Sequence, residues 1–173
     1  MENKMSWIVW VITAIIVFIC VAVVTIFYNL TKLQEETREK YLKVDGYRME
    51  KWNMVKLLLG YVESFHEDGK TFEKAHAVLD KDFLRLGKEE RLLLYRQMEE
   101  ILGTLIVEVK EHGNLQCEEK IRNLCMKLKD EAYKYHMAEA EYDRCVTKYN
   151  EQIEKAPGKY VAGIFGLKKQ PRL

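Results

Sequence analysis

The first thirty residues limit the fold most strongly, because most of them form one long stretch without charge. Residues 5–30 contain no Asp, Glu, Lys or Arg, and their apolar part reads WIVWVITAIIVFICVAVVTIFY. A helix of about 20 apolar residues crosses the hydrocarbon core of a bilayer. Two tryptophans and Tyr28 stand near the ends of the stretch, where aromatic rings favour the membrane interface. We therefore expect a short tail of residues 1–5 and a transmembrane anchor of residues 6–30.

A cleaved signal peptide and a buried helix of a soluble protein are the other two interpretations of this stretch. A signal peptide needs a basic start, a shorter apolar run and a pair of small residues at the cleavage site. Here Lys4 is the single basic residue before the run, and the segment VTIFYNL offers no small pair. We favour an uncleaved, single-pass anchor.

The orientation of the anchor follows from the basic residues on its two sides. Lys4 stands alone before the span, whereas Lys32, Arg38, Lys40 and Lys43 follow soon after it. Basic flanks remain on the cytoplasmic side of a membrane. We therefore expect the N-terminus outside the cell membrane and the C-terminal domain in the cytoplasm.

The composition of the chain excludes some classes of partner and site. Charged residues make up 32% of the 173 residues, yet the formal net charge is +1. Nucleic acid is therefore not an expected partner, because binding phosphates requires a basic face. The four cysteines, Cys20, Cys117, Cys125 and Cys145, form no C-x-x-C pair. We expect neither a disulfide framework nor a zinc site, and unpaired thiols favour a reducing compartment.

The remainder of the chain predicts an all-α fold. Apolar residues recur in steps of three and four after the span, so the first helix can continue directly from it. The segment HEDGK then breaks the pattern, and Thr71 can cap a second helix. We expect helices over about residues 31–66, 71–86, 88–112 and 115–155. Packed side by side, they make an elongated antiparallel bundle of residues 31–157 on a transmembrane helix.

The fourth expected helix carries the most regular pattern. One row of every seventh residue comprises Leu128, Tyr135, Tyr142, Tyr149 and Ala156. A second row comprises Ala132, Glu139, Val146 and Ile153, with one polar defect at the glutamate. Such rows form a seam that packs on neighbouring helices, as in a coiled coil. A buried tyrosine hydroxyl needs a hydrogen-bond partner, so we expect each to reach the rim of the bundle or a polar neighbour.

The helix pattern stops at Pro157, and the tail of residues 158–173 is apolar and basic, with the sequence KYVAGIFGLKK near its start. This tail either docks on the bundle or touches the membrane. Gly163 and Gly166 make a poor amphipathic helix, so we favour docking.

No sequence motif for catalysis is present. His66 and Glu67 begin like a zinc-protease motif, but Lys70 stands where the second histidine is required. No glycine-rich nucleotide loop or nucleophile motif occurs. We expect no enzyme and no catalytic, cofactor-binding or metal site.

From Tyr142 onward the chain resembles the LemA family of bacterial membrane-anchored proteins. That family carries Y-N-x-x-V-x-x-Y-N-x-x-I-x-x-F-P near its end, followed by a segment like V-A-G-x-F-G-F. The matching positions are Tyr142, Val146, Tyr149, Asn150, Ile153, Pro157, Val161, Ala162, Gly163, Phe165 and Gly166. The first asparagine is replaced by Asp143 and the last aromatic by Leu167. In the N-terminal half, Tyr28-Asn29 and a few other pairs match more loosely.

The resemblance implies an N-terminal anchor, a cytoplasmic antiparallel helical bundle and no known catalytic residues. We expect a scaffold or adaptor that binds a protein whose identity the sequence does not give. The alternative is a membrane-organising protein that binds lipid through its C-terminal tail. A homo-oligomer is a further candidate assembly. The surface that caps the bundle or binds a partner is expected at Tyr149, Asn150, Pro157, Gly163, Ile164, Phe165 and Gly166.

Overall fold

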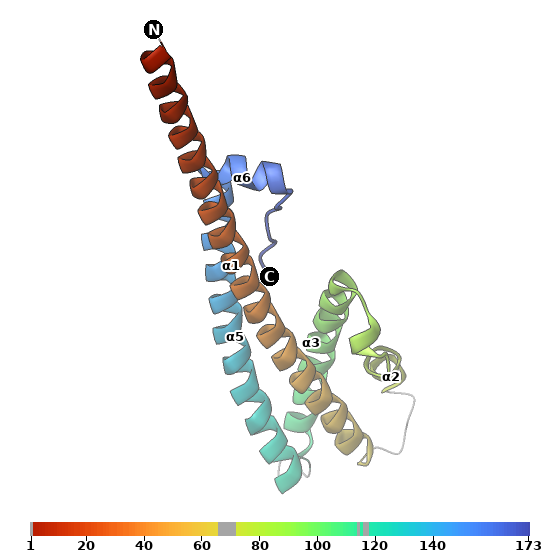
Figure 1. Cartoon of the computed structure of the whole chain (residues 1–173). Helices are drawn as coiled ribbons and strands as arrows, with labels where there is room; N and C mark the ends of the chain where they lie inside the picture. The colour runs from red at the N-terminus through yellow and green to blue at the C-terminus, as the bar shows by residue number, and fades with distance from the viewer. Residues whose placement is uncertain (1, 66–71, 114, 116–117) are drawn as a thin grey trace. The chain divides into compact units, whose positions relative to one another are not determined.

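A computed structural model describes residues 2–65, 72–113, 115 and 118–173. Every regular element in these ranges is a helix, which confirms the predicted all-α fold (Figure 1). Two compact units are distinguished by their contacts. The anchor unit comprises Met1–Leu42 and Glu139–Leu173, and the middle unit comprises Lys43–Ala138. Two helices, α1 and α5, contribute to both.

Helix α1 spans Glu2–Glu63 and includes both the uncharged stretch and the polar helix predicted after it. The polar helix therefore continues directly from the span, as its pattern allowed. The N-terminal part of α1 is long and apolar enough to cross a membrane, and its most apolar window is not buried inside the protein. Exposed apolar side chains over that length are what a helix in contact with lipid requires.

In the middle unit, α1 packs with α2 (Glu73–Leu79), α3 (Lys88–Glu111) and the first part of α5 (Glu119–Glu154). Helix α2 runs antiparallel to α1, as two side-chain pairs show: His76 meets Glu63, while Asp80 meets Lys56 on the preceding turns of α1. The core combines aliphatic and aromatic side chains, with Val55, Leu58, Leu79, Met98, Leu105, Ile121, Trp52 and Phe83 among those that are buried.

The second predicted helix is shorter than expected. Instead of continuing to Leu86, α2 ends at Leu79, and the 3₁₀ helix η2 (Phe83–Arg85) follows. Two aspartates, at positions 80 and 82, occupy the break, and Asp favours turns over helix interiors because its carboxylate competes for backbone N–H groups. The HEDGK segment at 66–70 and the proposed cap Thr71 lie outside the described residues.

In the anchor unit, α5 runs antiparallel to α1. Lys40 bonds to Glu141 at 2.8 Å, and Cys145, one turn further along α5, donates to Glu36 on the preceding turn of α1. Of the predicted seam, Tyr142, Val146, Tyr149 and Ile153 are buried here. Ala156 is exposed, because α5 ends at Glu154. The seam is thus one position shorter than predicted.

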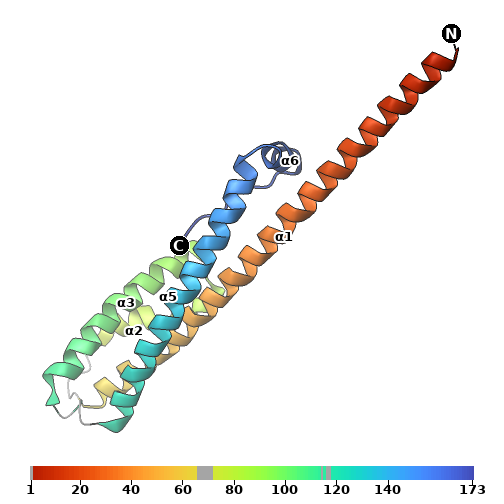
Figure 2. The ribbon, with the colours of Figure 1, turned by 90° about the vertical axis from the view of Figure 1, so that its left-hand side faces the viewer.

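Helix α6 (Gly158–Phe165) follows α5 and reverses the chain (Figure 2). The tail was expected to make a poor amphipathic helix because of its glycines, and the structure shows a short helix over its first half. Gly163 has open space around it, and Gly166 lies beyond the helix with a φ of 68°, where glycine is favoured as a C-cap. Gly158 is required at the reversal, since a Cβ there would collide with the carbonyl oxygen of Gln152.

Candidate functional site

The structure brings all seven predicted site residues together in the anchor unit, at the C-terminal end of α5 and on α6. Val161 and Ala162 of α6 form a buried cluster with Leu30, Tyr149 and Ile153. The tail therefore docks on α1 and α5 and covers seam residues that would otherwise face solvent. The seven residues divide into an inner group that holds the tail and an outer group on α6 that is exposed in whole or in part.

The inner group centres on Asn150. Its side-chain amide donates to the carbonyl oxygen of Gln170 at 2.8 Å, and the Gln170 N–H donates back to its Oδ1 at 2.9 Å. These two bonds satisfy both backbone polar groups of Gln170, as pairing with an antiparallel β-strand would. Tyr149 lies fully buried beside it, and Pro157 stands at the start of α6.

Further bonds from α5 to the C-terminal segment were missed by sequence reasoning. The Leu173 N–H donates to Asp143, and the Arg172 guanidinium donates to the Thr147 hydroxyl. Lys169 forms an ion pair with Glu154, and this lysine lowers the pKa of the Glu154 carboxyl. Residues 143, 147, 150 and 154 follow steps of four, three and four, so they form a polar stripe along one side of α5. This spacing is the sequence feature from which the polar stripe could have been predicted.

The buried tyrosines are satisfied unequally. The Tyr142 hydroxyl donates to the carbonyl oxygen of Pro171 at 2.8 Å, as expected for a buried phenol. The Tyr149 hydroxyl is buried and has no hydrogen-bond partner among the described residues, so for this tyrosine the prediction that each reaches the rim of the bundle or a polar neighbour was wrong. Burial also raises the pKa of Tyr149.

The outer group exposes apolar side chains. Ile164 is 73% exposed and Tyr160, one turn earlier, is 69% exposed. Phe165 is half-exposed, and its ring lies 4.2 Å from that of Phe27 on α1, measured between centroids. Gly163 lies between the two exposed side chains. An apolar face of this kind on a short helix indicates contact with another apolar surface.

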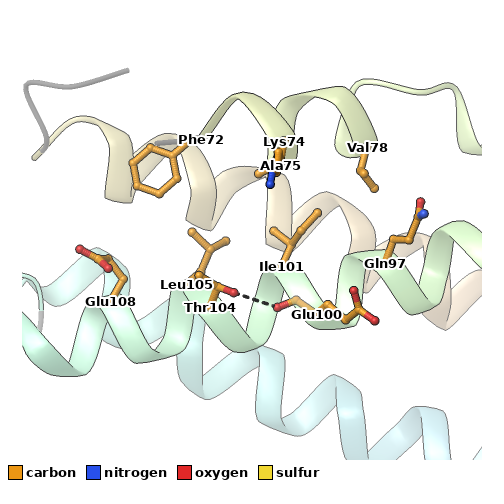
Figure 3. A pocket seen from close by; sticks show the side chains of 10 residues that line it. All are labelled: Phe72, Lys74, Ala75, Val78, Gln97, Glu100, Ile101, Thr104, Leu105 and Glu108. Carbon is orange, nitrogen blue, oxygen red and sulfur yellow. Dashed lines mark hydrogen bonds between the residues drawn. The ribbon is translucent and has the colours of Figure 1, made fainter. Parts of the chain in front are cut away.

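The middle unit contains a second candidate site, a groove between α2 and α3 (Figure 3). Its volume is about 400 Å³. The apolar side chains of Phe72, Ala75 and Val78 lie opposite Ile101 and Leu105. The groove is bordered by polar side chains, namely Lys74, Gln97, Glu100, Thr104 and Glu108. An apolar floor with a polar rim is the usual form of a site that accepts a helix.

The core of the middle unit also holds a buried cation. Arg48 is 1% exposed, and its guanidinium donates to the Tyr135 hydroxyl at 3.2 Å. The guanidinium carbon lies 5.3 Å from the centre of the Tyr95 ring and 5.6 Å from that of Tyr135. Lys51, also buried, pairs with Glu99 at 2.5 Å. Aromatic faces and a phenol thus stabilise charges that burial disfavours.

Comparison with known proteins confirms the resemblance. No curated protein sequence matches the chain. A model of the LemA family matches residues 50–173, which is more than half of the chain. The matched range contains the seam of α5, the polar stripe and α6, so the α5 residues that dock the tail lie within it, whereas Phe27 and Leu30 of α1 do not. The chain therefore belongs to the LemA family.

Proposed function

We propose that this protein is a non-enzymatic, membrane-anchored adaptor that binds a helix of a protein partner in the groove between α2 and α3. The observation that carries this proposal is the groove itself, whose apolar floor is bordered by charged residues. A partner helix with apolar side chains at every third or fourth position fits such a floor.

The charges on the rim select among such helices. Glu100 and Glu108 stand on the α3 side, and Lys74 stands on the α2 side. Glu108 also pairs with His112 at 3.1 Å. An amphipathic helix with lysine or arginine toward α3 therefore complements this groove best, because opposite charges at the rim set register and orientation.

A photo-reactive amino acid at Thr104, which is exposed on the rim, tests the proposal in cells. Val107, exposed on the same helix and outside the groove, is the matched control. We expect one discrete adduct from position 104 that mass spectrometry maps to an amphipathic basic helix and that is absent from position 107. The same products from both positions, or none from either, would reject the groove. An adduct to a second copy of the chain would indicate a homo-oligomer instead.

The adaptor is proposed to lie on the cytoplasmic side of the cell membrane, with the N-terminus outside. The four basic residues that follow the span support this orientation. Asn53 is exposed on α1, so Asn53→Cys provides a reporter in a chain whose native cysteines are serine. We expect a membrane-impermeant maleimide to label it only after cells are permeabilised. Labelling of intact cells would reverse the orientation and place partners outside.

A second candidate function is direct contact of the C-terminal tail with lipid. The exposed side chains of Tyr160 and Ile164 on α6 support it.

A further inference from the structure

We infer that α6 is an interfacial helix that lies beside the end of the span and binds anionic phospholipid. Tyr160 and Ile164 enter the lipid, and a neighbouring hollow receives a headgroup. This inference rests on the second candidate function, contact of the tail with lipid, and does not depend on the groove between α2 and α3.

The position of α6 along α1 places this helix at the end of the membrane span. A helix rises about 1.5 Å per residue, so a span that starts at Trp7 has covered about 30 Å, the thickness of the hydrocarbon core, near Phe27. The Phe165 ring packs against Phe27, and Val23 and Ile26 pack against the cluster that buries the inner face of α6. Because these contacts belong to the last turns of the uncharged stretch, α6 lies at the edge of the membrane core.

The direction of α6 is that of a helix lying close to the plane of the membrane. Within the anchor unit, α6 lies across the direction of α1 in Figure 1, and it is seen nearly end-on in Figure 2, where α1 is seen from the side. A helix that lies crosswise to a spanning helix is oriented close to the plane of the membrane. Interfacial helices take this orientation and bury their apolar side chains at the boundary between headgroups and acyl chains.

The outer face of α6 fits that boundary. Tyr160 and Ile164 are one turn apart on the face opposite Val161 and Ala162, so both can enter the bilayer together. Tyrosine favours this depth because its ring is apolar and its hydroxyl can reach water. Solvent contact would leave most of the surface of these two side chains in water, whereas lipid covers it.

Lysines around α6 favour anionic lipid over neutral lipid. Lys159 is exposed on α6, and Lys168 is exposed two residues after Gly166. Lysine near a membrane surface attracts anionic headgroups by about 1 kcal/mol each. The C-terminal Lys169 contributes less, because it pairs with Glu154.

A hollow at the same level supplies a place for a headgroup. It measures about 430 Å³ and lies between α1, α5 and the start of α6. Ile26, Leu30 and Leu33 provide an apolar wall that continues toward the span. The polar wall comprises Asn29, Lys32, Glu36, Lys148 and Gln152. Glu36, one turn beyond Lys32, accepts a hydrogen bond from the Cys145 thiol. Two lysines against one carboxylate leave the hollow cationic, as a phosphate requires.

The first experiment measures the depth of Ile164. The full chain carrying Ile164→Cys, with its native cysteines changed to serine, is labelled with an environment-sensitive fluorophore and reconstituted into vesicles. Asn53→Cys, labelled in the same way, is the control because Asn53 is exposed in the middle unit. We expect the label at position 164 to be quenched by nitroxide lipids and protected from iodide, and the label at position 53 to show the reverse.

Two outcomes would overturn the inference. Equal iodide quenching at positions 164 and 53 would show that α6 faces water. Protection from iodide without lipid quenching would show that a protein covers α6, and loss of that protection at low protein-to-lipid ratio would identify a second copy. Neither outcome affects the photo-crosslink from Thr104, so failure of this inference is distinguishable from failure of the adaptor proposal.

The second experiment tests the headgroup hollow by removing its cations. Lys32→Gln with Lys148→Gln is compared with Lys120→Gln with Lys127→Gln, a matched pair of exposed lysines on α5 in the middle unit. Native mass spectrometry counts phosphatidylglycerol and phosphatidylcholine molecules that remain bound after release from mixed nanodiscs. We expect the first pair to reduce the preference for phosphatidylglycerol on the order of tenfold. Equal preference in both variants and the unchanged chain would reject the hollow as the headgroup site.

Discussion

Asn150 on α5 and Gln170 in the C-terminal segment exchange two hydrogen bonds, one in each direction, at 2.8 and 2.9 Å. A single side chain therefore fixes a backbone peptide twenty positions later in the chain. The bonds are half-buried, so loss of either one exposes polar groups that water satisfies only in part.

We expect Asn150→Ala to release the C-terminal segment from α5. Two hydrogen bonds contribute about 1–3 kcal/mol together, so the exchange of the Gln170 amide with deuterium should accelerate accordingly. Hydrogen exchange with mass spectrometry measures this rate in the peptide that contains residues 167–173. Asn53→Ala, at an exposed position on α1, should leave the rate unchanged. If both variants exchange like the unchanged chain, the paired bonds do not hold the segment.

The seam of α5 predicts a larger effect at Val146, which is fully buried in the anchor unit. Val146→Asp places a carboxylate at a fully buried position among apolar side chains of the seam, which should destabilise the unit by about 3–5 kcal/mol. Circular dichroism during thermal unfolding should show a lower melting temperature and reduced helicity. Ala140→Asp adds the same charge at an exposed position on the same helix and should change little. Equal melting of the two variants would contradict a buried seam.

The long helices could be predicted because their evidence is local. Apolar residues at helical spacing decide which face is buried, and the burial of Tyr142, Val146 and Ile153 follows that rule. The family resemblance rests on α5 and the tail, where Tyr142, Tyr149 and Asn150 belong to the spaced motif and also hold the tail. The end of α2 was predicted too late. The helical spacing of apolar residues continues past Leu79, whereas Asp80 and Asp82 favour a turn there.

The candidate sites depended on pairings between distant parts of the chain. In the sequence, the stripe of Asp143, Thr147, Asn150 and Glu154 has the pattern of a solvent-exposed helix face. In the structure the chain reverses at Gly158, and residues 169–173 bind along this stripe. The groove between α2 and α3 depends on the distance between two helices, which periodicity does not specify. The contact of Phe27 with Phe165 likewise joins the span to the tail. Predicting these features requires tertiary structure.

The hydroxyl of Tyr135 should stabilise the middle unit through Arg48. Tyr135→Phe keeps the ring that faces the guanidinium but removes the acceptor of its 3.2 Å hydrogen bond. A hydrogen bond to a charged group contributes about 1.5–3 kcal/mol, and the buried cation cannot recover it from water. Chemical denaturation should reveal a loss of this size. Tyr133→Phe is the matched control because Tyr133 is 67% exposed on the same helix. A loss no larger than that of the control would show that the aromatic faces suffice.

The pKa of the Cys145 thiol should depend on the Glu36 carboxylate that faces it. Burial raises the pKa of Cys145, and the charge of Glu36 and its hydrogen bond with the thiol, at 3.7 Å, raise it further. Maleimide reacts with the thiolate, so labelling of a chain with Cys145 as its only cysteine should increase at a higher pH than labelling of a peptide cysteine. Glu36→Gln removes the negative charge, which should lower the pKa and accelerate labelling at neutral pH, although burial keeps the pKa above its ordinary value.

Glu35→Gln serves as the control for Glu36→Gln, because Glu35 pairs with Arg38 at 3.4 Å on the exposed side of α1. Its pH profile of labelling should match that of the unchanged chain. Stopped-flow measurement of the labelling rate across the pH range gives the profiles of the unchanged chain, Glu36→Gln and Glu35→Gln for comparison. If Glu36→Gln leaves the profile in place, the two groups do not interact in solution, and the antiparallel register of α1 and α5 in the anchor unit would lose one of its contacts. A shift only in that variant would instead fix Cys145 opposite Glu36, in the register that also places Glu141 beside Lys40.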